Sequence, residues 1–126
     1  MHINDLAVVD NTLVTKQNKA WNTIGHFSGT QTLNITNALA YDEIQIIARM
    51  TPPNAYVTKL SDIYRGGDFA NEKVDFMIAL GASFGGTFGI GVLCKYSWRN
   101  KTLAIDGAYY NTAIDTQNVT VFVYAR

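Results

Sequence analysis

The chain has little cysteine and little histidine, and each shortage excludes a class of site. Its single cysteine, Cys94, cannot form a disulfide within the chain or belong to a cysteine cluster. Its two histidines, His2 and His26, lie apart from each other and from Cys94, whereas zinc needs three or four converging ligands. Carboxylates at the short, regular spacing of a calcium loop occur only as isolated pairs. No metal site and no cofactor are therefore predicted.

Charge of either sign is also scarce. Ten basic and ten acidic residues cancel, so the chain lacks the basic excess that attracts nucleic acid or an anionic membrane, and neither partner is predicted. Charged residues make up 16% of the chain, against about 25% in typical soluble domains. A small domain with so few charges is expected to bury part of its surface in an oligomer. The alternative is a monomer whose surface is rich in Thr and Asn.

One uncharged, largely apolar run, residues 76–94, is long enough to cross a membrane. It contains five glycines, and its first part alternates with the period of a strand. We therefore predict a buried strand at residues 74–80 and a glycine-rich passage at 81–91, with a membrane span as the weaker alternative. The first residues, Met1 to Leu6, have no basic region before an apolar run, so no secretory leader is predicted.

Catalytic motifs are missing as well. Gly86 to Gly91 has closely spaced glycines, but a strand pattern follows where a nucleotide-binding turn requires a helix. No serine stands in a nucleophile-elbow context. Asp42 and Glu43 are adjacent, so in a strand their side chains point to opposite faces and cannot form a glycosidase pair. We predict a protein that is not an enzyme; a hydrolase with carboxylates gathered from separate strands is the alternative.

What the chain does contain is a succession of short strand patterns. In residues 119–126, Val and Ala alternate with Thr, Phe, Tyr and Arg, which is the clearest of them. A strand this apolar is expected to pair within a sheet. Further strands are predicted at residues 21–27, 32–36, 54–60, 74–80, 91–98 and 102–106. The chain is therefore predicted to be all-β: an antiparallel, jelly-roll-like β-sandwich of about eight strands at residues 21–126, after a short N-terminal arm or edge strand at 1–20.

Three segments need separate interpretation. Residues 37–50 are rich in helix formers, but at period 2 they place Ile44, Ile46, Ala48 and Met50 on one face, and their neighbours are strands. A strand at residues 43–51 is therefore favoured over a helix. Residues 65–68, Arg-Gly-Gly-Asp, have the composition of a turn, and residues 99–101 join the strands beside them as a hairpin.

Cys94 alternates with the apolar residues Val92, Tyr96 and Trp98 along its predicted strand. This position predicts a buried, unreactive thiol, with an intersubunit disulfide as the alternative.

Aromatic side chains are the remaining candidates for function. Phe27, Phe76 and Phe122 lie in strand patterns and are predicted core residues. Four tyrosines lie near predicted loops or strand ends, where such rings stack on sugars or fill a subunit interface. With two polar neighbours of one tyrosine, the predicted receptor-binding residues are Tyr56, Tyr64, Arg65, Asp68, Tyr109 and Tyr110. Packing under a loop is the alternative for the tyrosines, and a solvated turn for the other two.

Several short motifs occur in an order that resembles a known family. Trp21-x-x-Ile24 precedes Gly29-Thr30 and a Thr-rich strand; then come Tyr41-Asp-Glu-Ile-Gln-Ile, Tyr109-Tyr-Asn-Thr and Val119-Thr-Val-Phe-Val-Tyr-Ala-Arg126. This layout resembles the small C-terminal β-sandwich domains of phage and prophage tail fibres and related minor structural proteins. Those domains commonly end close to Thr-Val-Tyr-Tyr-Arg, from which Phe-Val-Tyr-Ala-Arg departs.

The resemblance implies a trimeric domain at a fibre tip, located in the virion after synthesis in the bacterial host cytoplasm. The implied partners are other virion proteins and a host-surface receptor, either a cell-wall or capsular polysaccharide or a protein. Three copies presented together raise the avidity of weak polysaccharide contacts, and a closed ring protects sheet edges. The alternative is a structural virion protein, for head decoration or tail assembly, that binds another virion protein and no glycan.

Overall fold

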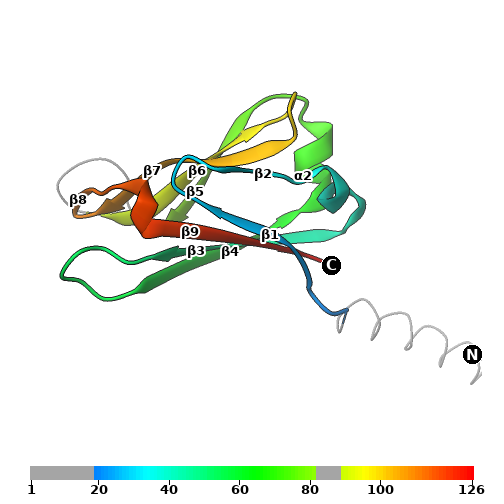
Figure 1. Ribbon diagram of the computed structural model, residues 1–126. Helices are drawn as coiled ribbons and strands as arrows, with labels where there is room; N and C mark the ends of the chain where they lie inside the picture. Colours follow the sequence, from blue (N-terminus) through cyan, green and yellow to red (C-terminus); the bar gives the residue numbers. More distant parts are fainter. Residues whose placement is uncertain (1–18, 82–88) are drawn as a thin grey trace, which may run out of the picture.

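A computed structural model describes residues 19–81 and 89–126, in which two antiparallel sheets pack face to face (Figure 1). The first sheet contains, in spatial order, β1 (Asn22–Ser28), β9 (Val119–Ala125), β3 (Glu43–Met50) and β4 (Thr58–Arg65). The second contains β2 (Thr32–Asn34), β7 (Thr102–Tyr110), β6 (Ile90–Ser97) and β5 (Phe76–Gly81), with the short β8 (Thr112–Ala113) paired to β7. The predicted all-β antiparallel sandwich is confirmed.

Strand β9 occupies the middle of the first sheet, between β1 and β3. It pairs antiparallel with both neighbours, so that Ala125 lies opposite Asn22 of β1 and Ile44 of β3. Side chains alternate between the two faces of a strand, and the side chains on one face of β9 are fully buried: Val119, Val121, Val123 and Ala125. The period-2 pattern therefore separated the two faces of this strand correctly.

The second sheet joins β5, β6 and β7 as successive antiparallel neighbours and places β2 beside β7. A strand distant in sequence thus lies beside one end of three consecutive strands, which is Greek-key order and gives the sandwich its jelly-roll-like character. The hairpin predicted across residues 99–101 is present, with Lys101 in the left-handed region at φ 56°. Strand β7 continues to Tyr110, beyond its predicted end at Asp106.

The inner faces of the two sheets form one hydrophobic core. Cys94 of β6 is fully buried in it, on the same face as Val92 and Tyr96. Burial raises the pKa of the Cys94 thiol to about 12, so at neutral pH the group is a protonated, unreactive thiol. The predicted buried position is confirmed, and a side chain in this position cannot reach a second subunit.

A short helix, α2 (Gly66–Asn71), closes one end of the core (Figure 1). Its Phe69 is fully buried and contacts three other rings edge to face, with centroids 6.4 Å from Tyr64, 5.4 Å from Phe76 and 5.0 Å from Tyr96. The turn predicted for residues 65–68 is wrong because the chain forms this helix directly after β4. Burial of Phe69 among the rings offsets the poor helix propensity of the two glycines that begin α2.

Other predicted boundaries also differ from the structure. The strand favoured at residues 43–51 is confirmed as β3 (Glu43–Met50), and of the helix weighed for residues 37–50 only a short 3₁₀ helix, η1 (Thr36–Ala40), is present. The strand predicted at residues 54–60 begins later, at Thr58, since Asn54 has φ 59° and belongs to a turn. Strands β2 and β5 are shorter than predicted, and β5 alternates buried and exposed residues, so it is buried on one face alone.

Two of the three phenylalanines predicted for the core lie there. Phe27 is buried, and Phe76 packs against the core from a partly buried position. Phe122 was predicted wrongly: it lies on the outer face of the first sheet, partly exposed, with its ring centroid 5.8 Å from that of His26. Val121 and Val123, on either side of it, take the inner positions.

Two predictions fall mainly outside the described residues. They are the arm or edge strand at residues 1–20, of which residues 19 and 20 alone are described, and the glycine-rich passage, of which residues 82–88 are not described. The helical span considered for residues 76–94 is wrong, since β5 and the start of β6 occupy its two described ends. No helix among residues 19–81 and 89–126 is long and apolar enough to cross a membrane.

Candidate functional site

The six predicted receptor-binding residues do not form one site. β4 runs from one end of the sandwich to the other, and the six residues divide between these ends (Figure 1). The end that carries α2 holds Tyr64, Arg65 and Asp68. The opposite end, with the loop after β3 and the end of β7, holds Tyr56, Tyr109 and Tyr110.

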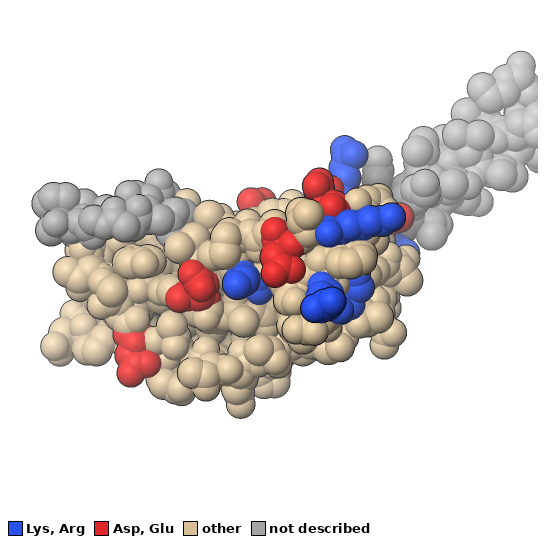
Figure 2. All heavy atoms as spheres, turned by 90° about the horizontal axis from the view of Figure 1, so that it is seen from above, with Lys and Arg blue, Asp and Glu red and all other residues tan. Residues whose placement is uncertain are grey.

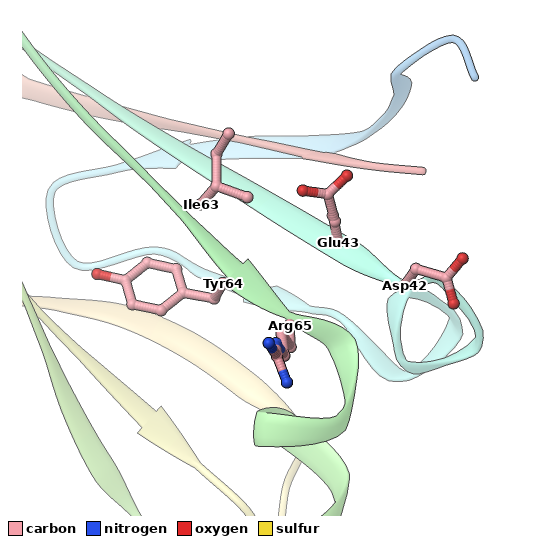
Figure 3. A pocket seen from close by; sticks show the side chains of 5 residues that line it. All are labelled: Asp42, Glu43, Ile63, Tyr64 and Arg65. Atoms are coloured by element: carbon pink, nitrogen blue, oxygen red, sulfur yellow. The ribbon is translucent and has the colours of Figure 1, made fainter. Parts of the chain in front are cut away.

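A pocket of about 580 Å³ at the α2 end is lined by Asp42, Glu43, Ile63, Tyr64 and Arg65 (Figure 3). Figure 3 shows Ile63 and Glu43 extending to one side of β4 and the ring of Tyr64 to the other. The Glu43 carboxylate is also engaged, because its Oε1 accepts a hydrogen bond from Arg126 Nε at 2.9 Å. The lining side chains therefore do not converge on one point, as the carboxylates of a hydrolase must.

The side chain of Tyr64 mainly packs against the core at this end of the sandwich, and little of it is available on the surface. Its ring is partly buried against Phe69, and its pKa is raised to about 12, first by burial and then by the charge and hydrogen bonding of Asp62. The hydroxyl consequently stays protonated up to strongly alkaline pH.

The carboxylates next to Tyr64 protect the open edge of β4. Asp62 Oδ1 accepts a hydrogen bond from the backbone N–H of Ile63 at 2.8 Å, and Asp68 Oδ2 accepts one from the N–H of Arg65 at 3.3 Å. Both N–H groups belong to the strand at the edge of the first sheet. Because these donors are occupied, a further strand cannot pair with this part of the edge without displacing the carboxylates.

The three tyrosines at the opposite end differ in their exposure. Tyr56 is 87% exposed in the loop between β3 and β4. Tyr109 and Tyr110 lie in β7, opposite Gly91 and Ile90 of β6, and both are partly buried. Of these three side chains, Tyr56 alone is fully presented to solvent.

The sequence interpretation missed a groove on the outer face of the first sheet. It has a volume of about 250 Å³, and we call it the sheet groove; its lining residues are Ile47, Arg49, Lys59, Phe122 and Tyr124. They are outward positions of three adjacent strands, with Phe122 opposite Ile47 across the β3–β9 pair. The available signal was the outward half of each alternation, which is usually polar on a solvated sheet but here includes Ile, Phe and Tyr.

Two like charges face each other at one side of the sheet groove. Arg49 of β3 is directly opposite Lys59 of β4, and like charges in this arrangement destabilise a sheet. Neither side chain has a hydrogen bond or an ion pair with any other described residue. No acidic residue lines the groove, so it presents positive charge that its own lining does not neutralise.

Further exposed apolar side chains lie on or just before the edge strands β4 and β5, which are neighbours at one side of the sandwich. We call Ile63, Val74 and Met77 the apolar flank; their exposed fractions are 47%, 56% and 48%. An apolar groove of about 230 Å³, lined partly by Val74 and Met77, runs beside them. Exposed apolar clusters of this kind mark surfaces that contact other proteins.

Charge is unevenly placed on the face seen in Figure 2. Lys and Arg side chains occupy the half nearer the start of the chain, while Asp and Glu are spread along the face. This face therefore has no continuous basic stripe. Among the residues that the structure describes, no three His, Cys, Asp or Glu side chains gather so as to hold a metal ion.

No family model, curated protein or solved structure matches this chain. The sandwich is therefore established by the structure itself, and the likeness to tail-fibre domains is a likeness of short motifs.

Proposed function

We propose that this chain is a non-enzymatic adhesion domain that binds a host-surface glycan, as a trimer at the tip of a phage tail fibre. The observation that carries the proposal is the sheet groove, where Phe122 and Tyr124 of β9 and Ile47 of β3 face outward from two paired strands. Aromatic rings stack on the apolar faces of sugars, and rings on a rigid sheet need little ordering when a ligand binds. The location in the virion and the trimer come from the resemblance of the sequence motifs.

The surroundings of the sheet groove support binding without catalysis. The carboxylates at the α2 end do not converge, and Glu43 is engaged by Arg126. Tyr56 lies just before β4, the strand that supplies Lys59 to the groove, so a glycan extending past Lys59 reaches this exposed ring. Trimeric presentation multiplies contacts that are individually weak.

The direct test measures binding of the full chain to cell walls and capsular polysaccharides of candidate bacterial hosts. Phe122→Ala and Tyr124→Ala are each expected to weaken binding by roughly tenfold, since each removes a stacking ring. Met77→Ala, which removes an exposed apolar side chain from the apolar flank, is the matched control and is expected to bind normally. Absence of binding to every host envelope, or release of reducing sugars by the wild-type chain, contradicts the proposal.

A second candidate function is supported by the apolar flank. In this alternative the chain is a structural virion protein, and Ile63, Val74 and Met77 are covered by another virion protein. Met77→Lys is then expected to abolish co-purification with capsid or tail components, whereas Phe122→Ala leaves it intact. If the chain is an adhesion domain, Phe122→Ala weakens glycan binding and Met77→Lys leaves it unchanged. The two variants together therefore separate the candidates.

A further inference from the structure

We infer that the sheet groove takes an anionic sugar polymer, whose acid groups lie between Arg49 and Lys59 while its sugar rings stack on Phe122 and Tyr124. The inference rests on the proposed function and names the chemical class of its ligand. It comes from the placement of two unneutralised cations beside two partly exposed rings on one sheet face.

The opposed cations are the first part of the argument. Arg49 and Lys59 repel each other across the β3–β4 pair, and no described residue compensates either charge. An acid group between them removes the repulsion and gains charge-assisted hydrogen bonds from both side chains. Violations of local pairing rules of this kind are expected at functional sites, where a ligand supplies the missing interaction.

The spacing of the rings is the second part. Ile47 and Arg49 are neighbouring positions on the same face of β3, so they lie about 7 Å apart along the strand. Phe122 is directly opposite Ile47, so on the same face it lies one strand across and one such step along from Arg49, with Lys59 one strand further. A sugar ring stacked on Phe122 can therefore direct its own acid group, or that of the next residue, toward Arg49 and Lys59.

The sparse charge favours a sugar polymer over nucleic acid. A nucleic acid carries one phosphate per nucleotide, and its binding draws on many Lys and Arg contacts. Here the groove has two cations, and the chain has no net charge. Nucleic acid therefore enters the test as an alternative outcome.

The test compares immobilised polymers by biolayer interferometry with the full chain. Alginate carries carboxylates, phosphorylated dextran carries phosphates on a sugar backbone, unmodified dextran is neutral, and oligo-dT represents single-stranded nucleic acid. At least one of the two anionic polymers is expected to bind at least tenfold more tightly than dextran and oligo-dT. That affinity is expected to fall as salt rises from about 50 to about 200 mM, because the contacts are charged. The anionic polymer that binds more tightly identifies the kind of acid group that the sheet groove prefers.

The decisive variant combines Arg49→Gln and Lys59→Gln in one chain. It is expected to lose the preference for the anionic polymer. The matched control is Lys95→Gln with Arg99→Gln, which removes the same charge from exposed positions of β6 and the adjoining turn and is expected to keep the preference. Equal binding of dextran and the anionic polymers, still dependent on Phe122, overturns this inference and leaves the proposed function standing. Preference for oligo-dT overturns it in favour of nucleic acid, and binding to none of these polymers or to any host envelope overturns both.

A ligand-free measurement tests the repulsion itself. In low salt, Arg49→Gln and Lys59→Gln are each expected to raise the thermal unfolding midpoint, since either change removes the repulsion. The double variant is expected to gain less than the sum of the two, because the repulsion can be removed once only. Lower midpoints for both single variants show that the cations do not oppose each other and overturn the inference.

Discussion

The hydroxyl of Tyr96 is buried and has no hydrogen-bond partner among the described residues. Its ring fits well, packed against Phe69 and Phe76 with centroids 5.0 and 5.1 Å away. An unpaired buried hydroxyl costs free energy that the ring packing does not recover. The ring of Tyr96 therefore stabilises the core, whereas its hydroxyl destabilises it.

Replacing that hydroxyl is expected to stabilise the fold. Tyr96→Phe should raise the free energy of unfolding by about 1 kcal/mol, measured by urea denaturation, because it removes the unpaired group and keeps the ring. Tyr64→Phe is the matched control, since Tyr64 interacts with Asp62 and is expected to lose stability. A destabilised Tyr96→Phe variant shows that the hydroxyl has a partner.

Cys94 leads to a pH dependence with a definite sign. The pKa of the thiol is raised by burial from 9.0 to about 12, so the unfolded chain loses this proton first. The resulting contribution to stability is complete below about pH 9 and is lost as pH rises toward 12. Tyr64 acts in the same direction between its ordinary pKa of 10.0 and about 12.

The expected result is a free energy of unfolding that declines from about pH 9 upward, measured by urea titrations at several alkaline pH values. Cys94→Ala should show a smaller decline, because one of the contributing groups is gone. At pH 8 a thiol reagent is expected to label Cys94 in step with unfolding. Rapid labelling of the folded chain contradicts the buried, protonated state.

Residue positions could be predicted from the sequence where alternation was unambiguous. The separation of the β9 valines from Phe122 and Tyr124, and the buried position of Cys94, followed directly from period 2. Phe122 was assigned to the core for its hydrophobicity, although the same alternation put it on the face opposite Val121 and Val123. The sheet groove was missed for that reason, because its apolar residues occupy positions that alternation assigns to solvent.

At the scale of elements, α2 shows how distant contacts override local preference. Two glycines and a turn-like composition gave no sign of a helix, and Phe69 could not be recognised as buried without its partners on β4, β5 and β6. The start of β4 was also predicted too early, at residue 54 in place of Thr58, because the sequence does not show that Asn54 adopts the left-handed conformation of a turn.

Phe69→Ala is expected to lower the free energy of unfolding by about 3 to 5 kcal/mol, because it empties the centre of the aromatic cluster. Chemical denaturation followed by circular dichroism measures the loss. Asn71→Ala, at an exposed position of the same helix, is the control and is expected to have little effect. Equal effects of the two substitutions show that α2 does not depend on its buried ring.

At the scale of the whole molecule, the fold class could be predicted because each strand carries its own alternation. Apart from the β6–β7 hairpin, the neighbours of each strand could not be predicted, since the pairing of β1 with β9 and of β2 with β7 joins segments far apart in sequence. The candidate site was divided for the same reason: tyrosines that look alike in sequence lie at opposite ends of β4.

The proposed trimer predicts a mass of about three times the 13.9 kDa chain by light scattering coupled to size-exclusion chromatography. Met77→Lys is expected to leave that mass unchanged, because the adhesion function does not use the apolar flank. Asn100→Lys adds the same charge to an exposed turn and is also expected to leave the mass unchanged. A wild-type mass equal to one chain contradicts the trimer.

The central place of β9 also constrains when the protein can fold. Asn22 lies 103 positions before Ala125. The side-chain amide of Asn22 donates a hydrogen bond to the carbonyl oxygen of Ala125. Until residues 119–125 have left the ribosome, β1 and β3 have no strand between them, and their inner faces are exposed to solvent. Folding of the first sheet must therefore wait for nearly all of this sequence to be synthesised, and contacts this distant in sequence form slowly. Chaperones or neighbouring nascent chains would meet those exposed faces before β9 does.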